Sequence, residues 1–166
     1  MKLKTIVTQR VALTMTLLAA TLSVSWSIHA DNSRIEQFSK QAAAQNGHGN
    51  YSIITQIGNN NRNNISQSAS YQAGNYSSIY QLGNYNAANI NQVGGNNVSN
   101  VFQAGTNHIA DIAQSGSTSA ELNASVRQVG NRSDIQISQS GSGYRGISVE
   151  QQAFSNNARP VTVETY

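Results

Sequence analysis

The stretch QLGNYNAANINQVGGNNVSNVFQAG, residues 81–105, carries the pattern that decides the fold. Its Asn, Gln and Gly content is that of a linker, yet Gln81, Gln92 and Gln103 stand eleven residues apart, and glycine follows each of them two places later. A disordered polar tract has no physical reason to keep such a register. The stretch is therefore interpreted as part of a repeating structure.

The repeat extends to both sides of this stretch. Nine seven-residue segments end in Gln at intervals of 11, 12 or 14 residues, and a tenth ends in Thr165. The glutamines are Gln56, Gln67, Gln81, Gln92, Gln103, Gln114, Gln128, Gln139 and Gln151. The first five segments open with Asn50, Asn61, Asn75, Asn86 and Asn97. These residues are expected to stack in ladders, coil upon coil.

The fifth residue of every segment is Ile or Val. These residues are Ile54, Ile65, Ile79, Ile90, Val101, Ile112, Val126, Ile137, Val149 and Val163. Positions one, three, five and seven of a strand share one face, so the aliphatic residue and the glutamine point the same way. We expect this face to be the interior, with the β-branched residues as a thin apolar core.

Glycine marks the connectors between segments. Gly58, Gly83, Gly94, Gly105, Gly116, Gly130 and Gly141 each lie two places after a glutamine. A tight arc needs a positive φ, which glycine adopts without steric cost and Asn tolerates next best. Most connectors have four residues; those at 68–74, 115–121 and 152–158 have seven.

Strand, arc and strand together predict one coil of a flattened, all-β, two-sheet β-solenoid. Five imperfect coils are expected, at 50–67, 75–92, 97–114, 122–139 and 145–165. Stacked side-chain amides can bond to one another along the axis, which satisfies polar groups that burial otherwise penalises. A sandwich of hairpins is the alternative, but it does not require identical residues at identical strand positions.

The first thirty residues have the pattern of a secretory signal peptide, with a basic start, an apolar run and cleavage after Ala30. A transmembrane anchor is the alternative, although Ser and Thr dilute the run. Residues 31–49 are expected to be an N-terminal targeting or leader segment. Without the signal, Lys+Arg and Asp+Glu number seven each, which gives no case for nucleic-acid binding. The chain has no cysteine, so disulfides do not stabilise it.

The sequence shows no convergent catalytic or metal-binding group. His48 and His108 lie sixty residues apart, and Asp111 and Asp134 fall at different positions of separate segments. We therefore expect no enzyme activity, no catalytic or metal-ligating residue, no cofactor and no small-molecule substrate. The Gly-Gly-x-Gly-x-Asp repeat of a calcium-binding β-roll is absent. An ice-binding or carbohydrate-binding solenoid would present rows of identical outward residues, whereas here the inward residues repeat and the outward ones vary.

Outward positions of the first-strand sheet form an aromatic and aliphatic stripe. Its members are Tyr51, Ile53, Tyr76, Tyr80, Val98 and Phe102. The stripe is open to two interpretations: a surface for a hydrophobic partner, or the ordinary preference of strands for aromatic residues.

An uncapped solenoid can add further coils at its ends and grow into an open filament. The motif of a Gln-terminated segment, a Gly/Asn arc and an Asn-x5-Gln segment, five times after a signal peptide, resembles the curlins, the subunits of bacterial curli fibres. The resemblance covers about residues 50–165; His108, Leu122, Arg145 and Arg159 depart from the Ser or Asn that the family favours at position one.

The resemblance implies secretion through a dedicated outer-membrane pore with accessory factors, and assembly into a cell-surface amyloid for adhesion and biofilm. It also implies two subunit types, a major one that forms the fibre and a minor one that nucleates it. The nucleator type is favoured because 31–49 lacks a glycine-rich leader, QFSKQAAAQ at 37–45 is similar to the stretch before the first repeat of nucleators, and the last coil is irregular at Arg145, Arg159, Pro160 and Thr165. The alternatives are the major subunit and a non-polymerising secreted adhesin or binding module, and the odd last coil has a further interpretation as a frayed cap.

Overall fold

The computed structural model describes residues 34–41, 49–154 and 158–166, and the side chains of the latter two ranges. The expected signal peptide, its cleavage site at Ala30 and the first residues of the expected leader lie outside the described residues. The described residues form strands, turns and bends without any helix. The chain is all-β, as the period of two predicts.

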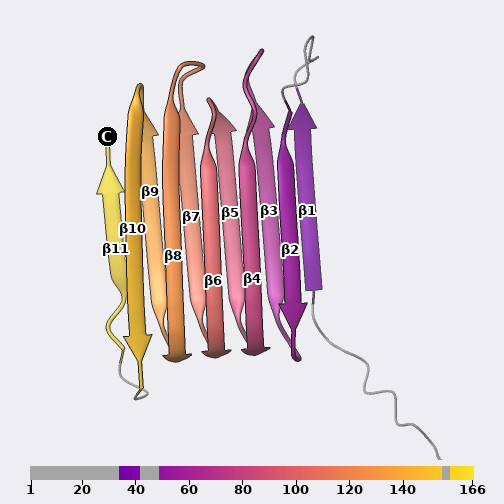
Figure 1. Ribbon diagram of the computed structural model, residues 1–166, viewed down its shortest axis with the longest axis vertical. Coiled ribbons are helices and arrows are strands. Elements are labelled where there is room, and N and C mark those ends of the chain that lie inside the picture. The colour runs from indigo at the N-terminus through magenta and orange to yellow at the C-terminus, as the bar shows by residue number, and fades with distance from the viewer. Residues whose placement is uncertain (1–33, 42–48, 155–157) are drawn as a thin grey trace, which may run out of the picture. The chain divides into compact units, whose positions relative to one another are not determined.

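Eleven strands are present in the described part of the chain. They are β1 (Arg34–Gln41), β2 (Tyr51–Ile57), β3 (Arg62–Ala69), β4 (Tyr76–Asn84), β5 (Ala87–Gly94), β6 (Val98–Thr106), β7 (Ile109–Gly116), β8 (Glu121–Asn131), β9 (Asp134–Gly141), β10 (Tyr144–Ala153) and β11 (Val161–Thr165). They make a six-stranded sheet, β1-β3-β5-β7-β9-β11, and a five-stranded sheet, β10-β8-β6-β4-β2. Every pairing is parallel, and the chain alternates between the two sheets (Figure 1). The two stacked sheets form the predicted β-solenoid.

The register places like residues on like residues. In the six-stranded sheet Ile65, Ile90, Ile112 and Ile137 are aligned, as are Gln67, Gln92, Gln114 and Gln139. In the five-stranded sheet Gln56, Gln81, Gln103, Gln128 and Gln151 are aligned in the same way. A one-residue slip would turn every inward side chain outward, so burial of this face fixes the register.

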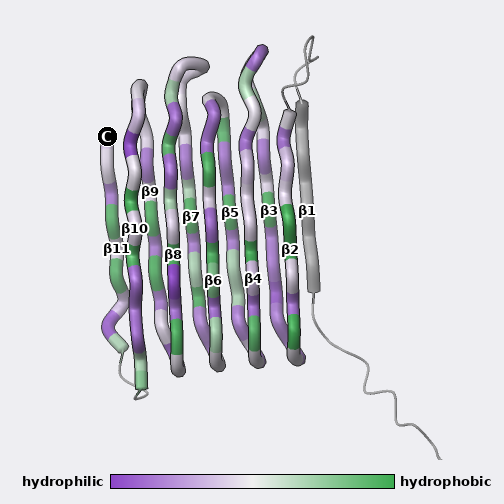
Figure 2. The backbone as a smooth tube through the Cα atoms, viewed as in Figure 1, coloured by the Kyte–Doolittle hydropathy of each residue, from purple (hydrophilic) through white to green (hydrophobic). Residues whose placement is uncertain are grey.

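The apolar core is thin and continuous. Seven of the predicted inward aliphatics are buried, and the other three, Ile54, Val149 and Val163, pack against this cluster from the terminal coils. Figure 2 shows hydrophilic and hydrophobic residues mixed along the strands, and the inward face itself carries both amides and aliphatic side chains. The predicted inward positions are confirmed.

Strand β1 was not expected. Its residues fall in the segment that the sequence predicts to be a leader, yet β1 pairs with β3 over eight residues, from Arg34 opposite Arg62 to Gln41 opposite Ala69. At the register of Ile65 it carries Gln37, and at that of Gln67 it carries Ser39. β1 therefore continues the backbone pairing without continuing the repeat.

The arcs confirm the glycine prediction at six positions and correct it at one. Gly58, Gly83, Gly94, Gly105, Gly130 and Gly141 have φ between 76° and 135°. Gly116 does not lie in the left-handed region, because the longer connector that follows it turns further on, where the Ala120 N–H donates to the Ser117 carbonyl at 2.9 Å. Gly116 is instead required by space: a Cβ there would lie 2.9 Å from the Cβ of Ala120.

Candidate assembly interface

Two ladders of side-chain amides run along the solenoid axis. In each, the Nε2 of one glutamine donates to the Oε1 of the glutamine one coil further on, over distances between 2.7 and 3.2 Å. One ladder runs Gln56–Gln81–Gln103–Gln128 and the other Gln67–Gln92–Gln114–Gln139. All six bonds point the same way along the chain, so each ladder has a donor end and an acceptor end.

In six of the eight ladder glutamines the amide nitrogen also donates to a backbone carbonyl of the opposite sheet. Gln92 donates to the Tyr76 carbonyl at 3.0 Å, Gln103 to the Ala87 carbonyl at 2.9 Å, and Gln114 to the Val98 carbonyl at 3.1 Å. Gln67, Gln128 and Gln139 make the same bond to Tyr51, Ile109 and Asn123. The crossing bond fixes the orientation of the amide and therefore the direction of the ladder. It also explains how so many amides are buried without losing their hydrogen bonds.

The asparagines at position one form ladders of the opposite direction. Asn75 Nδ2 donates to Asn50 Oδ1 at 3.1 Å, and Asn97 Nδ2 donates to Asn75 Oδ1 at 2.9 Å. In the other row the backbone N–H of Asn86 donates to Asn61 Oδ1 at 3.0 Å. All five predicted asparagines therefore lie in stacked rows, although in the second row the donor is the backbone rather than a side chain.

The asparagine rows end where the sequence departs from the repeat. Asn97 Oδ1 is buried without a partner in the described part of the chain, and at the next coil's position stands Leu122, whose side chain has no donor. In the other row His108 takes the place of Asn: its N–H donates to Asn86 Oδ1 at 3.1 Å, and its Nδ1 accepts from the Ser133 N–H at 3.3 Å. His108, which departs from Ser or Asn at position one of its segment, is fully buried and continues the row.

The environment of His108 keeps its ring neutral. Its Nε2 lies 3.2 Å from the Ala104 carbonyl, which places the ring proton on Nε2 and leaves Nδ1 as the acceptor. Burial lowers the pKa of His108, against a smaller raising effect of the carbonyls of Ala104 and Gly130. Protonation would turn Nδ1 from an acceptor into a second donor facing the Ser133 N–H.

The last coil leaves the glutamine ladders, which corrects one predicted position. Gln151 is aligned with Gln128, but its Nε2 donates to the Arg159 carbonyl at 2.6 Å and its Oε1 is buried without a partner in the described residues. In the other ladder Thr165 stands opposite Gln139 and is too short to continue it.

The coil stack ends in strand edges. Within the described residues β2 pairs only with β4, β10 only with β8 and β11 only with β9, while β1 covers the edge of β3. Their inward side chains are intermediate in burial where those of the middle coils are buried. Unpaired parallel edges with aligned backbone groups are sites at which a further strand can add.

The outer face of the five-stranded sheet carries stacked rings. The Tyr51 and Tyr76 ring centroids lie 5.8 Å apart, and those of Tyr80 and Phe102 lie 5.5 Å apart at 3° between planes. The Arg127 guanidinium lies 5.3 Å from the Phe102 centroid. The predicted stripe thus stacks on itself from coil to coil, and whether it binds a partner stays an open prediction.

An exposed ion pair continues this row. Arg127 Nη1 lies 2.9 Å from Glu150 Oε1. The hydrogen bond from Gln152 and the charge of Arg127 lower the pKa of the Glu150 carboxyl. Both side chains are about half exposed, so the pair contributes little to stability.

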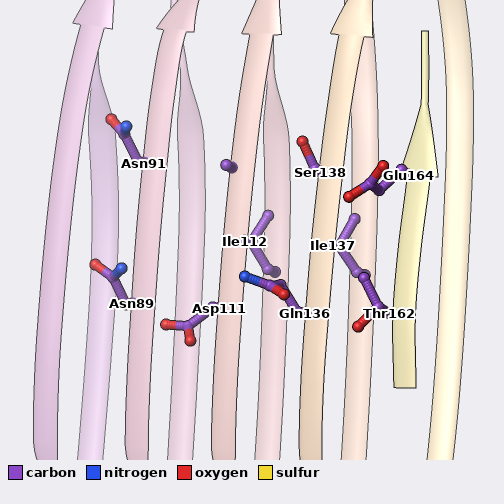
Figure 3. Close-up of a pocket in the computed structure, with 10 residues that line it drawn as sticks. Asn89, Asn91, Asp111, Ile112, Gln136, Ile137, Ser138, Thr162 and Glu164 are labelled. Atoms are coloured by element: carbon purple, nitrogen blue, oxygen red, sulfur yellow. The ribbon is translucent and has the colours of Figure 1, made fainter. Parts of the chain in front are cut away.

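The outer face of the six-stranded sheet has a depression of about 440 Å³. Figure 3 shows its polar side chains, among them Asn89, Asp111, Gln136 and Glu164, on separate strands. No group of three or more His, Cys, Asp or Glu that could hold a metal lies together in the described residues. Asp111 and Asp134, which the sequence places on this sheet, lie on β7 and β9.

Comparisons with known proteins identify no relative of this chain. No family model matches it, no curated protein matches it and no solved structure matches it. Among the described residues no helix is long and apolar enough to cross a membrane.

Proposed function

We propose that this chain is a secreted structural subunit of an extracellular amyloid fibre of the curli kind, and that it nucleates a more regular related subunit at the cell surface, for adhesion and biofilm matrix. The observation that carries the proposal is the pair of directional glutamine ladders, in a stack of parallel strands whose outer strands β2, β10 and β11 each pair on one side only among the described residues. A stack of this kind is extended by the same contacts that hold it together.

Three physical properties support growth by addition. The coil-to-coil contact is parallel and in register, as in cross-β fibres. Its interior is neutral, with amides and aliphatics facing amides and aliphatics. The two ends of the stack differ, so addition is head-to-tail and does not close on itself.

The irregular last coil supports the nucleating role over that of the fibre body. Gln151 and Thr165 leave the ladder, and Arg145 and Arg159 replace asparagine at position one. Stacking of a second copy on that end is therefore less favourable than stacking within the middle coils. The regularity of the middle coils is the observation that favours the alternative, a major subunit.

The proposal is tested by adding substoichiometric purified chain, residues 31–166, to a curlin-type major subunit and following thioflavin fluorescence. We expect a shortened lag. Ile54 points inward on the edge strand β2 and Ile53 points outward beside it, so Ile54→Lys is expected to suppress seeding through an inward charge at the edge, and Ile53→Lys to leave it unchanged.

The outcomes separate the candidate functions. An unshortened lag with the unaltered chain would remove the nucleating role. Fibre growth by this chain alone, without seeding, would favour the major subunit. A chain that neither seeds nor forms fibres would be a non-polymerising adhesin or binding module.

A further inference from the structure

The direction of the glutamine ladders makes the two ends of the solenoid chemically different. Gln67 donates to Gln92, and Gln81 donates to Gln103, always toward the coil of higher residue number. Each Oε1 along the ladder therefore faces the coil of lower residue number. The Oε1 of the first glutamine in a ladder therefore has no earlier glutamine of this chain to donate to it.

The first rung of the six-stranded sheet is buried and incomplete. Gln67 is 1% exposed, and its Oε1 has no hydrogen-bond partner in the part of the chain that the structure describes. A buried carbonyl oxygen without a partner is unfavourable, and a donor that reaches it is therefore stabilising. By the geometry of the later rungs, this oxygen faces the place where the amide of a preceding glutamine would lie.

Strand β1 pairs with β3 at that edge, and its sequence has no glutamine at the register of Gln67. It stands beside β3 with Ser39 at the register of Gln67 and Gln37 at that of Ile65. At the neighbouring edge, that of β2, no strand of the described part of the chain is paired, and Gln56 begins its ladder there. The N-terminal end thus presents one open edge and one edge held by a strand that does not match the repeat.

The last coil of a second copy of this chain does not complete this end. Its Gln151 amide is held by the Arg159 carbonyl, and its other strand carries Thr165 where a glutamine is needed. A coil that ends in glutamine on both strands places an Nε2 donor opposite each open acceptor. Coils 75–92 and 97–114 of this chain have that pattern.

We propose that the edges of β2 and β3 form a docking surface for the last coil of a related chain that ends both strands in glutamine, and that β1 holds the β3 edge until that coil replaces it. This inference rests on the proposed function. To the proposed function it adds three points: the N-terminal end of the stack binds the partner, the partner's last coil ends both strands in glutamine, and β1 slows the binding.

The probe is this chain, residues 31–166, with Arg145→Asn, Arg159→Asn and Thr165→Gln, whose last coil then has the pattern of the middle ones. Its growth from fragmented seeds is followed by thioflavin fluorescence. Seeds with Gln67→Met lack the acceptor at the end, and seeds with Gln92→Met lack an equally buried interior rung as a matched control. We expect about a tenfold slower growth from Gln67→Met seeds than from Gln92→Met seeds, as loss of one buried hydrogen bond implies.

Two further comparisons keep the test decisive. If the Gln67→Met seeds lose β-structure by circular dichroism, the pair Gln56→Met and Gln103→Met asks the same question in the other sheet. Seeds that lack residues 31–41 are expected to grow severalfold faster, because the β3 edge is then open.

Each result bears on one element of the proposal. Equal growth from the two methionine variants would overturn the assignment of the recruiting end. Unaltered monomer growing as fast as the probe would overturn the requirement for a glutamine-ended coil and make a second copy the occupant. Unchanged or slower growth without residues 31–41 would overturn the role of β1. Unaltered seeds that accelerate nothing would count against the proposed function itself.

Discussion

The side-chain amide of Gln92 donates to Oε1 of Gln114 at 2.9 Å, one coil further along the solenoid, and both residues are buried. The same nitrogen also contacts the Tyr76 carbonyl and the Ser99 hydroxyl. A neutral amide can act as donor and acceptor at once, which a carboxylate cannot. The interior of this protein therefore depends on glutamine as such rather than on polarity in general.

Replacing Gln92 by Glu is expected to destabilise the fold by about 3–5 kcal/mol at neutral pH, since it buries a charge and removes its donors. Gln136→Glu on the exposed face of β9 is the matched control and is expected to cost less than about 1 kcal/mol. Urea denaturation followed by circular dichroism measures both. The difference should shrink at acidic pH, where the buried carboxyl is neutral; equal denaturation midpoints for the two variants would contradict the prediction.

The repeat made most of this fold predictable. The fifth-position aliphatics and the Gln interval specify strand register, since each coil repeats the same requirement, and the structure confirms coils and core. β1 could not be predicted, because Gln37 and Ser39 break the pattern at the positions where it would show. The direction of the ladder could not be predicted either, because the crossing bonds to backbone carbonyls decide it.

Gly105→Ala is expected to destabilise the protein by at least about 2 kcal/mol, because a β-carbon strains a positive φ and meets a backbone atom. Its φ is 135°, and an added Cβ would overlap the Gly130 carbonyl of the next coil. Gly146→Ala is the control, since no atom lies within 4 Å of its added Cβ. Chemical denaturation of the two variants tests this, and a Gly105→Ala midpoint close to that of Gly146→Ala would show that the arcs can relax.

Tyr85→Asn is expected to stabilise the fold by about 0.5–1 kcal/mol, since Asn tolerates the left-handed region better than an aromatic residue. Tyr85 has φ of 57° in the arc between β4 and β5, and Asn60 and Asn107 hold the same place in other arcs at 57° and 59°. Tyr71→Asn, at an exposed tyrosine without a positive φ, controls for the loss of the ring. Thermal or urea unfolding decides the sign, and a less stable Tyr85→Asn variant would mean that the exposed ring contributes more than the backbone strain costs.

His108→Asn is expected to remove a pH dependence from the stability of the solenoid. The folded protein holds His108 neutral with a lowered pKa, so the unfolded chain binds the proton more readily. Stability from this site is therefore complete above the ordinary histidine pKa of 6.5 and is lost as pH falls from there toward the lowered value. Asn makes equivalent hydrogen bonds in this row: Asn86 accepts from the His108 N–H and donates to the Gly105 carbonyl at 3.1 Å.

The measurement is the urea midpoint of the unaltered chain and of His108→Asn between about pH 7 and pH 5, the range in which histidine titrates. The unaltered chain should lose stability across this range, and the variant should lose less. Exposed carboxylates such as Glu150 are common to both proteins, so their titration cancels in the difference. Parallel curves would show that protonation of His108 costs the fold no stability, contrary to the neutral ring that burial and the bonds to the Ala104 carbonyl and the Ser133 N–H imply.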